Sequence, residues 1–330
     1  MLMSRLRRLR VFAFLMKDAF KEFRKNDPLR FGSSTAFFTT FALPPILVIL
    51  TNLLGFLYNA DFISYQLIAK LQDMFGQRGA TQLYAVLQNI QNIPTHWSYG
   101  LLGMLFLIFV STTLFIVVQK SLNELWHIRP RKRKGIKKLV RNRAKSLAII
   151  LATGFLFLIS LLSDSALSYI GNNLNQFMPT TTAFVVRSAN LLVSFFFVTA
   201  WFAITFKYLP DVHIPWRPIW IGAGVTGLLF SFGKFILNHL LINSRLGPIY
   251  GPSASVLLVM LFVFYSSMIL FYGAAFTKTY ANYAAIKMRP KPYAVKIKVR
   301  TKARRQGTDN DVTANKKNNS SGTDINPIGI

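Results

Sequence analysis

The sequence predicts an all-α integral membrane protein, a bundle of six transmembrane helices with amphipathic helices at its N-terminus and in one outer loop. The first observation is composition: 52% of the 330 residues are hydrophobic and the mean hydropathy is positive, which soluble domains of this size seldom reach. The second is that the 39 Lys and Arg residues cluster between apolar blocks, as in membrane proteins with basic cytoplasmic loops. The third is that six apolar stretches are long enough to cross a bilayer.

Each predicted span offers about 20 apolar residues, the number that a helix needs to cross a hydrocarbon core of roughly 30 Å. The spans cover approximately residues 35–57, 99–119, 147–170, 184–208, 217–241 and 253–281. The chain is therefore divided into a cytoplasmic N-terminal interfacial helix, a membrane domain and a basic, largely disordered cytoplasmic tail, over residues 1–34, 35–281 and 282–330.

The numbers of Lys and Arg residues in the connections predict the orientation, because positively charged loops stay in the cytoplasm. Residues 1–34 carry nine, residues 120–146 eleven and residues 282–330 eleven. The three alternate connections carry two, none and one. We therefore expect both termini and the 120–146 loop to lie in the cytoplasm.

Two segments outside the spans have an amphipathic pattern. Residues 4–25 alternate Arg or Lys with large apolar residues, which suits a helix lying in the membrane interface. Residues 58–98, in the first outer connection, place Leu, Ile and Phe at roughly helical spacing and are too long for a simple turn. We expect one or two interfacial helices there.

The sequence offers little material for catalysis, and we expect no enzyme activity and no metal or cofactor. Cysteine is absent, so thiol chemistry and Cys-ligated metals are excluded. The four histidines are far apart and lack neighbouring pairs of carboxylates, and we interpret His127 and His213, at span ends, as hydrated residues without a chemical role. Glu22 and Glu124 are the only glutamates.

Gly222-Ala-Gly-Val-Thr-Gly227 matches the glycine pattern of dinucleotide-binding loops. That fingerprint requires a preceding strand and an acidic residue about 20 positions later, and this sequence has neither. The glycines lie inside an apolar span, where Ala223, Gly227 and Ser231 recur every four residues. We therefore predict a flat face for helix packing.

Basic runs at Arg129–Lys134 and at residues 296–305 could contact phosphates. They lack the interleaved aromatic residues that stack on bases. In a membrane protein such runs determine topology and attract anionic headgroups. We expect membrane lipids as partners and no nucleic acid.

Charged residues inside apolar spans are candidates for function, because burying a charge in lipid is costly. Asp164, Arg187 and Lys234 fall in the predicted outer half of the membrane, and Arg245 lies in the adjoining outer loop. Together they could bind an anionic headgroup such as a phosphate. The alternative is that they are separate residues whose charged ends reach water at the boundary.

Hydroxyl side chains and a proline pair mark the first predicted span. Prolines remove backbone hydrogen bonds, so a kink there needs local hydroxyls, water or neighbouring helices, and could line a cavity. The alternative is that the hydroxyls only hold helices together. The residues of this candidate cavity or kink are Ser34, Thr35, Thr39, Thr40, Pro44 and Pro45.

Several strings in the sequence resemble the YihY/virulence factor BrkB family of bacterial six-span membrane proteins, formerly labelled ribonuclease BN-like. They run from the Ser34–Pro45 segment, through Leu122-Asn-Glu-Leu-Trp126 and Tyr208-Leu-Pro-Asp-Val212, to Tyr250-Gly251 and Gly273-Ala-Ala-Phe-Thr277.

The resemblance implies a bacterial inner-membrane protein, and its cation pattern includes a basic residue at Lys234. One departure is Ala275, where the family usually has Glu. The ribonuclease label looks like a misassignment, because the sequence lacks the His and Asp clusters that metal-dependent RNA cleavage requires.

We expect a transporter or flippase-like protein for an anionic lipid or other amphiphile. The alternative is a non-transporting envelope scaffold that docks a partner through its basic loops and tail. Assembly as a homo-oligomer or with another envelope protein stays open.

Overall fold

The computed structural model of the chain describes residues 2–55, 97–130, 179–242 and 254–297, with short helical pieces between residues 69 and 85 and between 144 and 169. The described structure is mostly helical, as the sequence predicts. Its long helices are α1 (Leu2–Lys25), α2 (Pro28–Gly55), α4 (Trp97–Leu125), α6 (Pro179–Tyr208), α7 (Trp216–Ile242) and α9 (Ala254–Tyr283). Short strands are β1 (Ile128–Pro130), β2 (Val212–His213), β3 (Arg289–Pro290) and β4 (Ala294–Lys296).

Three helices in the described part of the chain are long and apolar enough to cross a membrane, over Phe184–Tyr208, Trp216–Ile236 and Val256–Tyr283. They coincide with the last three predicted spans. The first two predicted spans fall largely on α2 and α4, and the third, 147–170, is only partly described. Most of the predicted outer-loop helix region, 58–98, lies outside the described residues. The total of six spans therefore stays a prediction.

The N-terminal region differs from the single interfacial helix predicted over residues 1–34. α1 ends at Lys25, Asp27 adopts a left-handed conformation with φ of 49°, and α2 begins at Pro28. Aspartate tolerates this conformation better than most residues, and proline suits the first position of a helix, where an N–H has no partner in the helix. The Asp-Pro pair thus ends one helix and begins the next.

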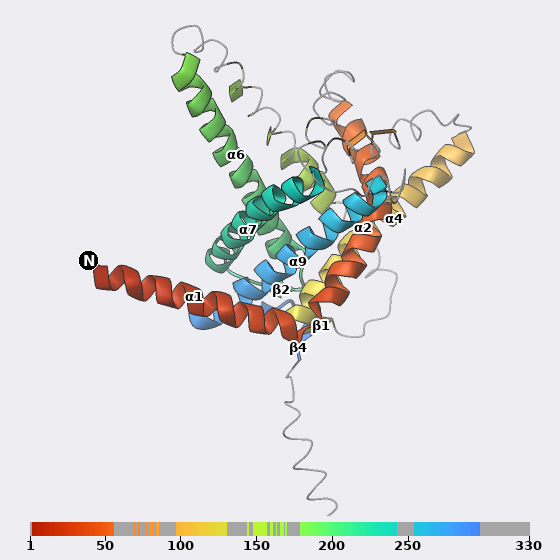
Figure 1. The fold of residues 1–330 in the computed structure, drawn as a ribbon. Coiled ribbons are helices and arrows are strands. Elements are labelled where there is room, and N and C mark those ends of the chain that lie inside the picture. Colours follow the sequence, from red (N-terminus) through yellow and green to blue (C-terminus); the bar gives the residue numbers. More distant parts are fainter. Residues whose placement is uncertain are drawn as a thin grey trace, which may run out of the picture. The chain divides into compact units, whose positions relative to one another are not determined.

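The other helices are arranged around α9, which contacts α1, α2, α4 and α7 (Figure 1). α2 also packs on α4, and α6 packs on α7. Small residues allow this crowding, since Ala274 and Ala275 of α9 are fully buried. The final apolar span is therefore the centre of the described fold.

Glycines set the close approach of α7 to its neighbours. A methyl group at Gly222 would collide with Thr277 of α9, and one at Gly273 of α9 would collide with Thr226 of α7. A methyl group at Gly227 would lie 2.6 Å from a threonine hydroxyl of α6. The predicted role of this glycine segment in helix packing is confirmed.

The predicted stripe itself is not one flat face. Ala223 is fully buried and Gly227 packs on α6, whereas Ser231 is exposed. Residues spaced by four rotate by about 40° around a helix of 3.6 residues per turn. Two such steps therefore carry Ser231 off the contact surface.

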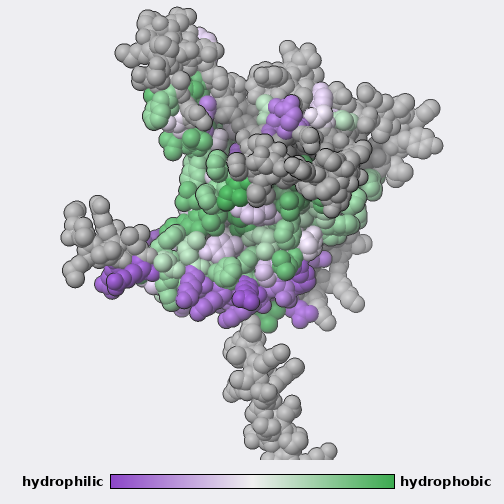
Figure 2. All heavy atoms as spheres, in the orientation of Figure 1, coloured by the Kyte–Doolittle hydropathy of each residue, from purple (hydrophilic) through white to green (hydrophobic). Residues whose placement is uncertain are grey.

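The largest buried core lies where α4, α6 and α9 end and α7 begins. Its fully buried large side chains include Trp126, Phe206, Ile214 and Ile219. Farther along α6 and α7, large apolar side chains face outward, including Phe184, Leu191, Leu192, Leu228, Phe232 and Phe235. Such an apolar exterior suits lipid rather than water. Figure 2 shows it above an edge of hydrophilic residues that follows α1.

α9 ends in a Schellman motif, after which the chain returns to the bundle. Ile286 N donates to Ala281 O (2.8 Å) and Ala285 N donates to Asn282 O (3.1 Å), with Ala285 at φ of 53°. Beyond it, β3 pairs antiparallel with β2, and β4 pairs with β1. The compact unit extends to Val295, and residues 296–330 form a separate unit. The predicted tail, 282–330, therefore begins with a structured segment.

Candidate functional site

Buried and half-buried polar side chains gather at the end of the described bundle where α1, α4 and α9 terminate. They form two clusters. The Glu22 cluster consists of Glu22, His127 and Lys278, and the Asp211 cluster consists of Gln119, Asn123, Asp211, Lys291 and Tyr293.

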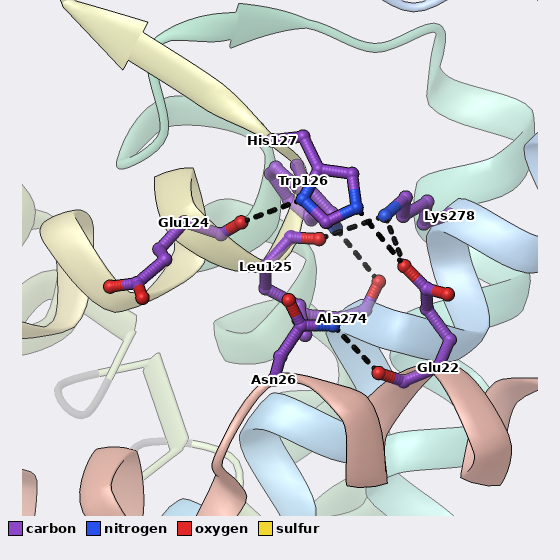
Figure 3. Close-up of polar contacts among 8 residues, drawn as sticks. All are labelled: Glu22, Asn26, Glu124, Leu125, Trp126, His127, Ala274 and Lys278. Carbon is purple, nitrogen blue, oxygen red and sulfur yellow. Dashed lines mark hydrogen bonds and ion pairs between the residues drawn. The ribbon is translucent and has the colours of Figure 1, made fainter. Parts of the chain in front are cut away.

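The Glu22 cluster joins three segments that are far apart in the sequence (Figure 3). Lys278 Nζ, on α9, lies 2.5 Å from Glu22 Oε1 on α1 and also donates to Leu125 O at the end of α4 (2.9 Å). His127 Nε2 approaches the same Glu22 oxygen at 3.5 Å. The Lys278 side chain is 9% exposed and that of Glu22 is 25% exposed. The ion pair is therefore largely shielded from water, which strengthens it.

The turn after α4 places His127 toward this carboxylate. His127 has φ of 55°, and its N–H donates to Glu124 O at 2.9 Å. The preceding Trp126 is fully buried and its Nε1 donates to Ala274 O of α9 at 2.9 Å. The tryptophan thus fixes the end of α4 against α9, and the strained turn then directs the imidazole to α1.

The pKa of the Glu22 carboxyl lies below its ordinary value of 4.5. Burial alone would raise this pKa, but the hydrogen bond and charge of Lys278, with the charges of His127 and Lys25, more than offset that effect. Glu22 is therefore ionised at neutral pH and supplies a counter-charge to the nearly buried Lys278.

The Asp211 cluster surrounds a carboxylate that is 5% exposed. Asn123 Nδ2 donates to Asp211 Oδ2 (3.1 Å), and the Asp211 N–H donates back to Asn123 Oδ1 (2.8 Å). Gln119 Nε2 lies 3.3 Å from Asp211 Oδ1 and 2.8 Å from Leu209 O. The amide side chains of α4 thus hold the loop between α6 and α7 through charge-assisted hydrogen bonds.

The segment after α9 completes this cluster. Tyr293 OH donates to Asp211 Oδ1 (3.1 Å), Lys291 N donates to Asp211 O (3.0 Å), and Lys291 Nζ donates to Pro210 O (2.6 Å). The pairing of β2 with β3, Val212 opposite Pro290, fixes the same two segments. α4, the α6–α7 loop and the segment after α9 are therefore fastened at one buried carboxylate.

The two clusters can hold the helix ends and loops at this end of the bundle together through ion pairs and hydrogen bonds.

Within the described residues, no group of three or more His, Cys, Asp or Glu side chains is arranged to bind a metal ion. Arg30 and Glu124 form a further ion pair between α2 and α4 at 2.5 Å, with side chains 57% and 54% exposed. Exposed pairs of this kind contribute little.

The predicted headgroup site is described only at Lys234, which is half-buried on α7. Arg187 belongs to α6, but its side chain lies outside the described residues, as do Asp164 and Arg245. The structure therefore does not bring these four residues together, nor separate them, and the site stays a prediction.

The predicted kink in the first span lies on a helix that continues through Pro44 and Pro45. Three of the hydroxyls bind carbonyls of their own helix: Ser34 to Phe31 O, Thr39 to Thr35 O (2.7 Å) and Thr40 to Ala36 O (3.0 Å). Thr35 Oγ1 is buried without a hydrogen-bond partner among the described residues. The described contacts of Ser34, Thr39 and Thr40 are therefore local to α2.

The sequence reasoning missed Lys278, Asp211 and their partners, and interpreted His127 as hydrated although it is drawn into the Glu22 cluster. One signal was present: Lys278 is a cation inside the last apolar span, where charges need a partner. Ala275, next to the Trp126 acceptor Ala274, is fully buried. A glutamate at that position would require a buried partner of its own.

Long apolar helices with outward-facing Leu and Phe, closed at one end by polar clusters, define a helical membrane protein. The chain belongs to the family described as Virulence factor BrkB, whose family model matches residues 19–297. The resemblance seen in the sequence is thereby confirmed.

Curated relatives carry the name UPF0761 membrane protein. The one from Chromohalobacter salexigens is 25% identical, covering 78% of this chain and 61% of the relative. The one from Alcanivorax borkumensis is 24% identical over 77% and 57% of the two chains, and the one from Teredinibacter turnerae 22% identical over 86% and 64%. The chain thus spans about three-fifths of these relatives' length. No solved structure matches it significantly.

Proposed function

We propose that this membrane protein is a six-span protein of the bacterial inner membrane, with both termini in the cytoplasm, that moves an anionic amphiphile such as a phospholipid between the two sides of the membrane. The membership in the BrkB family and the three candidate spans support the membrane location.

The orientation is supported by which segments meet. The Glu22 cluster joins the end of α1 to α9 and to the end of α4, and the Asp211 cluster joins α4 to the α6–α7 loop and to the segment after α9. The six predicted spans place two crossings between each of these segments and the next. All of them are then on the same side of the membrane, which is consistent with the contacts. Because the adjoining connections are the cation-rich ones, that side is the cytoplasm in our proposal.

Lys234 is the observation that carries the substrate class. It lies in the candidate span Trp216–Ile236, half-buried, on a helix that otherwise exposes Phe232 and Phe235. At roughly 1.5 Å per residue it stands roughly 27 Å along α7 from Trp216, near the far boundary of the hydrocarbon layer. A cation at that depth suits an anionic headgroup held beside lipid chains.

The test is lipid movement in liposomes that contain the purified protein and a fluorescent phosphatidylglycerol. We expect Lys234→Gln to slow the exchange between leaflets about tenfold, the loss of one charge-assisted contact, and Lys234→Arg to retain most of it. Lys287→Gln, which removes an exposed cation beyond α9, is the matched control. Wild-type exchange in a protein lacking both Lys234 and Arg187 would overturn the proposed site, and no exchange with the wild-type protein would overturn transport.

Deleting residues 296–330 separates this proposal from the scaffold alternative. The compact unit ends at Val295, so the deletion removes from the strands of the fold only Lys296, the last residue of β4. Transport predicts nearly unchanged complementation of a deletion strain, whereas docking of a partner through the basic tail predicts its loss.

A further inference from the structure

An open cleft of about 440 Å³ lies between α1 and α9, with α7 at its base. Its floor consists of Leu15, Ile221 and Phe276, of which Leu15 is 4% exposed and Phe276 fully buried. Its mouth carries Arg7 on α1 and Tyr283 on α9. The cleft therefore combines a hydrocarbon interior with a cation at its opening.

The interior suits an apolar chain. Phe12, 45% exposed, lies with its ring centroid 5.9 Å from that of Phe276 and forms one wall. The floor belongs to a packed apolar cluster that also includes Ala19 and Val225. The volume is in the range of pockets that enclose much of a small ligand.

The cleft lies at the level of a membrane boundary. The candidate span on α9 ends at Tyr283, so Tyr283 is at the depth where tyrosine rings are enriched in membrane proteins. α1 packs Leu15 and Ala19 inward and exposes Lys17 and Lys21, the arrangement of a helix in the interface. In Figure 2 the hydrophilic edge that follows α1 borders the apolar surface.

We propose that this cleft binds one anionic phospholipid of the adjoining leaflet, with the phosphate at Arg7 and an acyl chain on Phe276 and Leu15. Charge complementarity selects this occupant: Arg7 lines the cleft, and residues 5–10 of α1 contain four arginines and no acidic residue. The alternative occupant is an amphipathic helix of a partner protein, which would place its own polar face over Arg7.

The cleft is separate from the Lys234 site and does not depend on transport. The family match begins at residue 19, so the α1 wall of the cleft lies outside the residues shared with the family model. The proposed lipid binding therefore rests on the α1 residues that line the cleft and not on the family match.

The test is native mass spectrometry of the full-length purified protein, titrated with phosphatidylglycerol or with phosphatidylcholine of the same chains. Arg7→Gln should weaken phosphatidylglycerol binding about fivefold, as expected for one cation at the surface, and phosphatidylcholine binding much less. Arg10→Gln is the matched control, because it removes the same charge one turn later on α1 from an exposed residue that does not line the cleft. Because its charge lies outside the cleft, Arg10→Gln should weaken phosphatidylglycerol binding less than the roughly fivefold that about 1 kcal/mol per cation gives for Arg7→Gln.

Filling the cleft tests the apolar part. Val11 lines the cleft and is half-buried, so Val11→Trp should weaken binding of both lipids, provided that the thermal unfolding midpoint is unchanged. Equal losses for Arg7→Gln and Arg10→Gln would reduce the effect to surface charge and overturn the site, as would binding of a co-purified peptide in the cleft. Lys234→Gln should leave the binding in this cleft unchanged even where it slows lipid transport, so the two proposals can fail separately.

Discussion

Replacing Glu22 by glutamine should destabilise the protein more than replacing its partner Lys278 by methionine. Glu22→Gln removes the carboxylate that pairs with a lysine whose side chain is 9% exposed and which also donates to Leu125 O. Lys278→Met removes the buried charge and leaves a carboxylate that is 25% exposed and still near His127. Both substitutions break the same ion pair, but Glu22→Gln leaves the lysine charge behind and Lys278→Met leaves the carboxylate charge behind.

The exposures set the expected size of the effect. Removing one partner of a fully buried pair costs about 3–5 kcal/mol. Because a quarter of the Glu22 side chain reaches solvent, which screens the pair, we expect about 2 kcal/mol for Glu22→Gln and about 1 kcal/mol or less for Lys278→Met.

The effect should also depend on pH. Glu22 has a pKa below its ordinary value of 4.5, so its ionised form stabilises the native state at pH values above 4.5. As the pH falls through the lowered pKa, Glu22 becomes protonated and that contribution is lost. The difference between the wild-type protein and Glu22→Gln should therefore shrink as the pH falls below 4.5.

The assay is thermal unfolding in detergent micelles, followed by tryptophan fluorescence. Trp126 hydrogen-bonds Ala274 O beside the cluster and reports on its integrity. Asp18→Asn, which removes an exposed carboxylate one turn earlier on α1, is the control for charge alone. The reasoning is refuted if Glu22→Gln loses no more stability than Asp18→Asn, or if Lys278→Met is the more damaging change.

Four further substitutions test the helix end, the helix packing and the Asp211 cluster in the same assay. Ala285→Gly should raise stability by about 1 kcal/mol, because glycine adopts the φ of 53° that ends α9 without steric cost; a lower midpoint would contradict this. Gly273→Ala should cost about 1–3 kcal/mol because its methyl group collides with α7, whereas Gly224→Ala, with no atom within 4 Å of the new methyl group, should be neutral or stabilising. The opposite order would exclude the close approach of α7 and α9. Asn123→Ala should cost about 1–3 kcal/mol, since Asp211 would stay buried with one donor fewer; a loss within about 0.5 kcal/mol would show that water replaces the amide.

Part of the fold could be predicted from the sequence because bilayer thickness and backbone hydrogen bonding leave few alternatives. A long apolar run must form a helix in lipid, so the predicted spans 184–208, 217–241 and 253–281 coincide with helices. The glycines of α7 could be assigned to packing because their surroundings exclude a nucleotide loop. Which neighbour each glycine meets, α9 for Gly222 and α6 for Gly227, required the structure.

The candidate sites could be predicted less well, because sequence distance hides which charges meet. Lys234 was identifiable as a cation in an apolar span. Lys278 is also a cation in an apolar span. Its partner Glu22 lies on α1, at the other end of the chain, so the sequence does not show that the two meet. Asp211 gave no signal, since an aspartate in a loop next to a proline is ordinarily solvated. The tertiary structure buries it between α4 and the segment after α9.

The sequence by itself determined that this is a membrane protein and to which family it belongs. Hydropathy and short sequence motifs can be recognised from residues that are neighbours in the chain. The tertiary structure alone decided that α9 is the central helix, that Glu22, His127 and Lys278 form one charged cluster, and that α1 and α9 enclose a cleft. These features depend on contacts between residues far apart in the chain, and the free energy of such contacts comes from burial that no single segment can achieve.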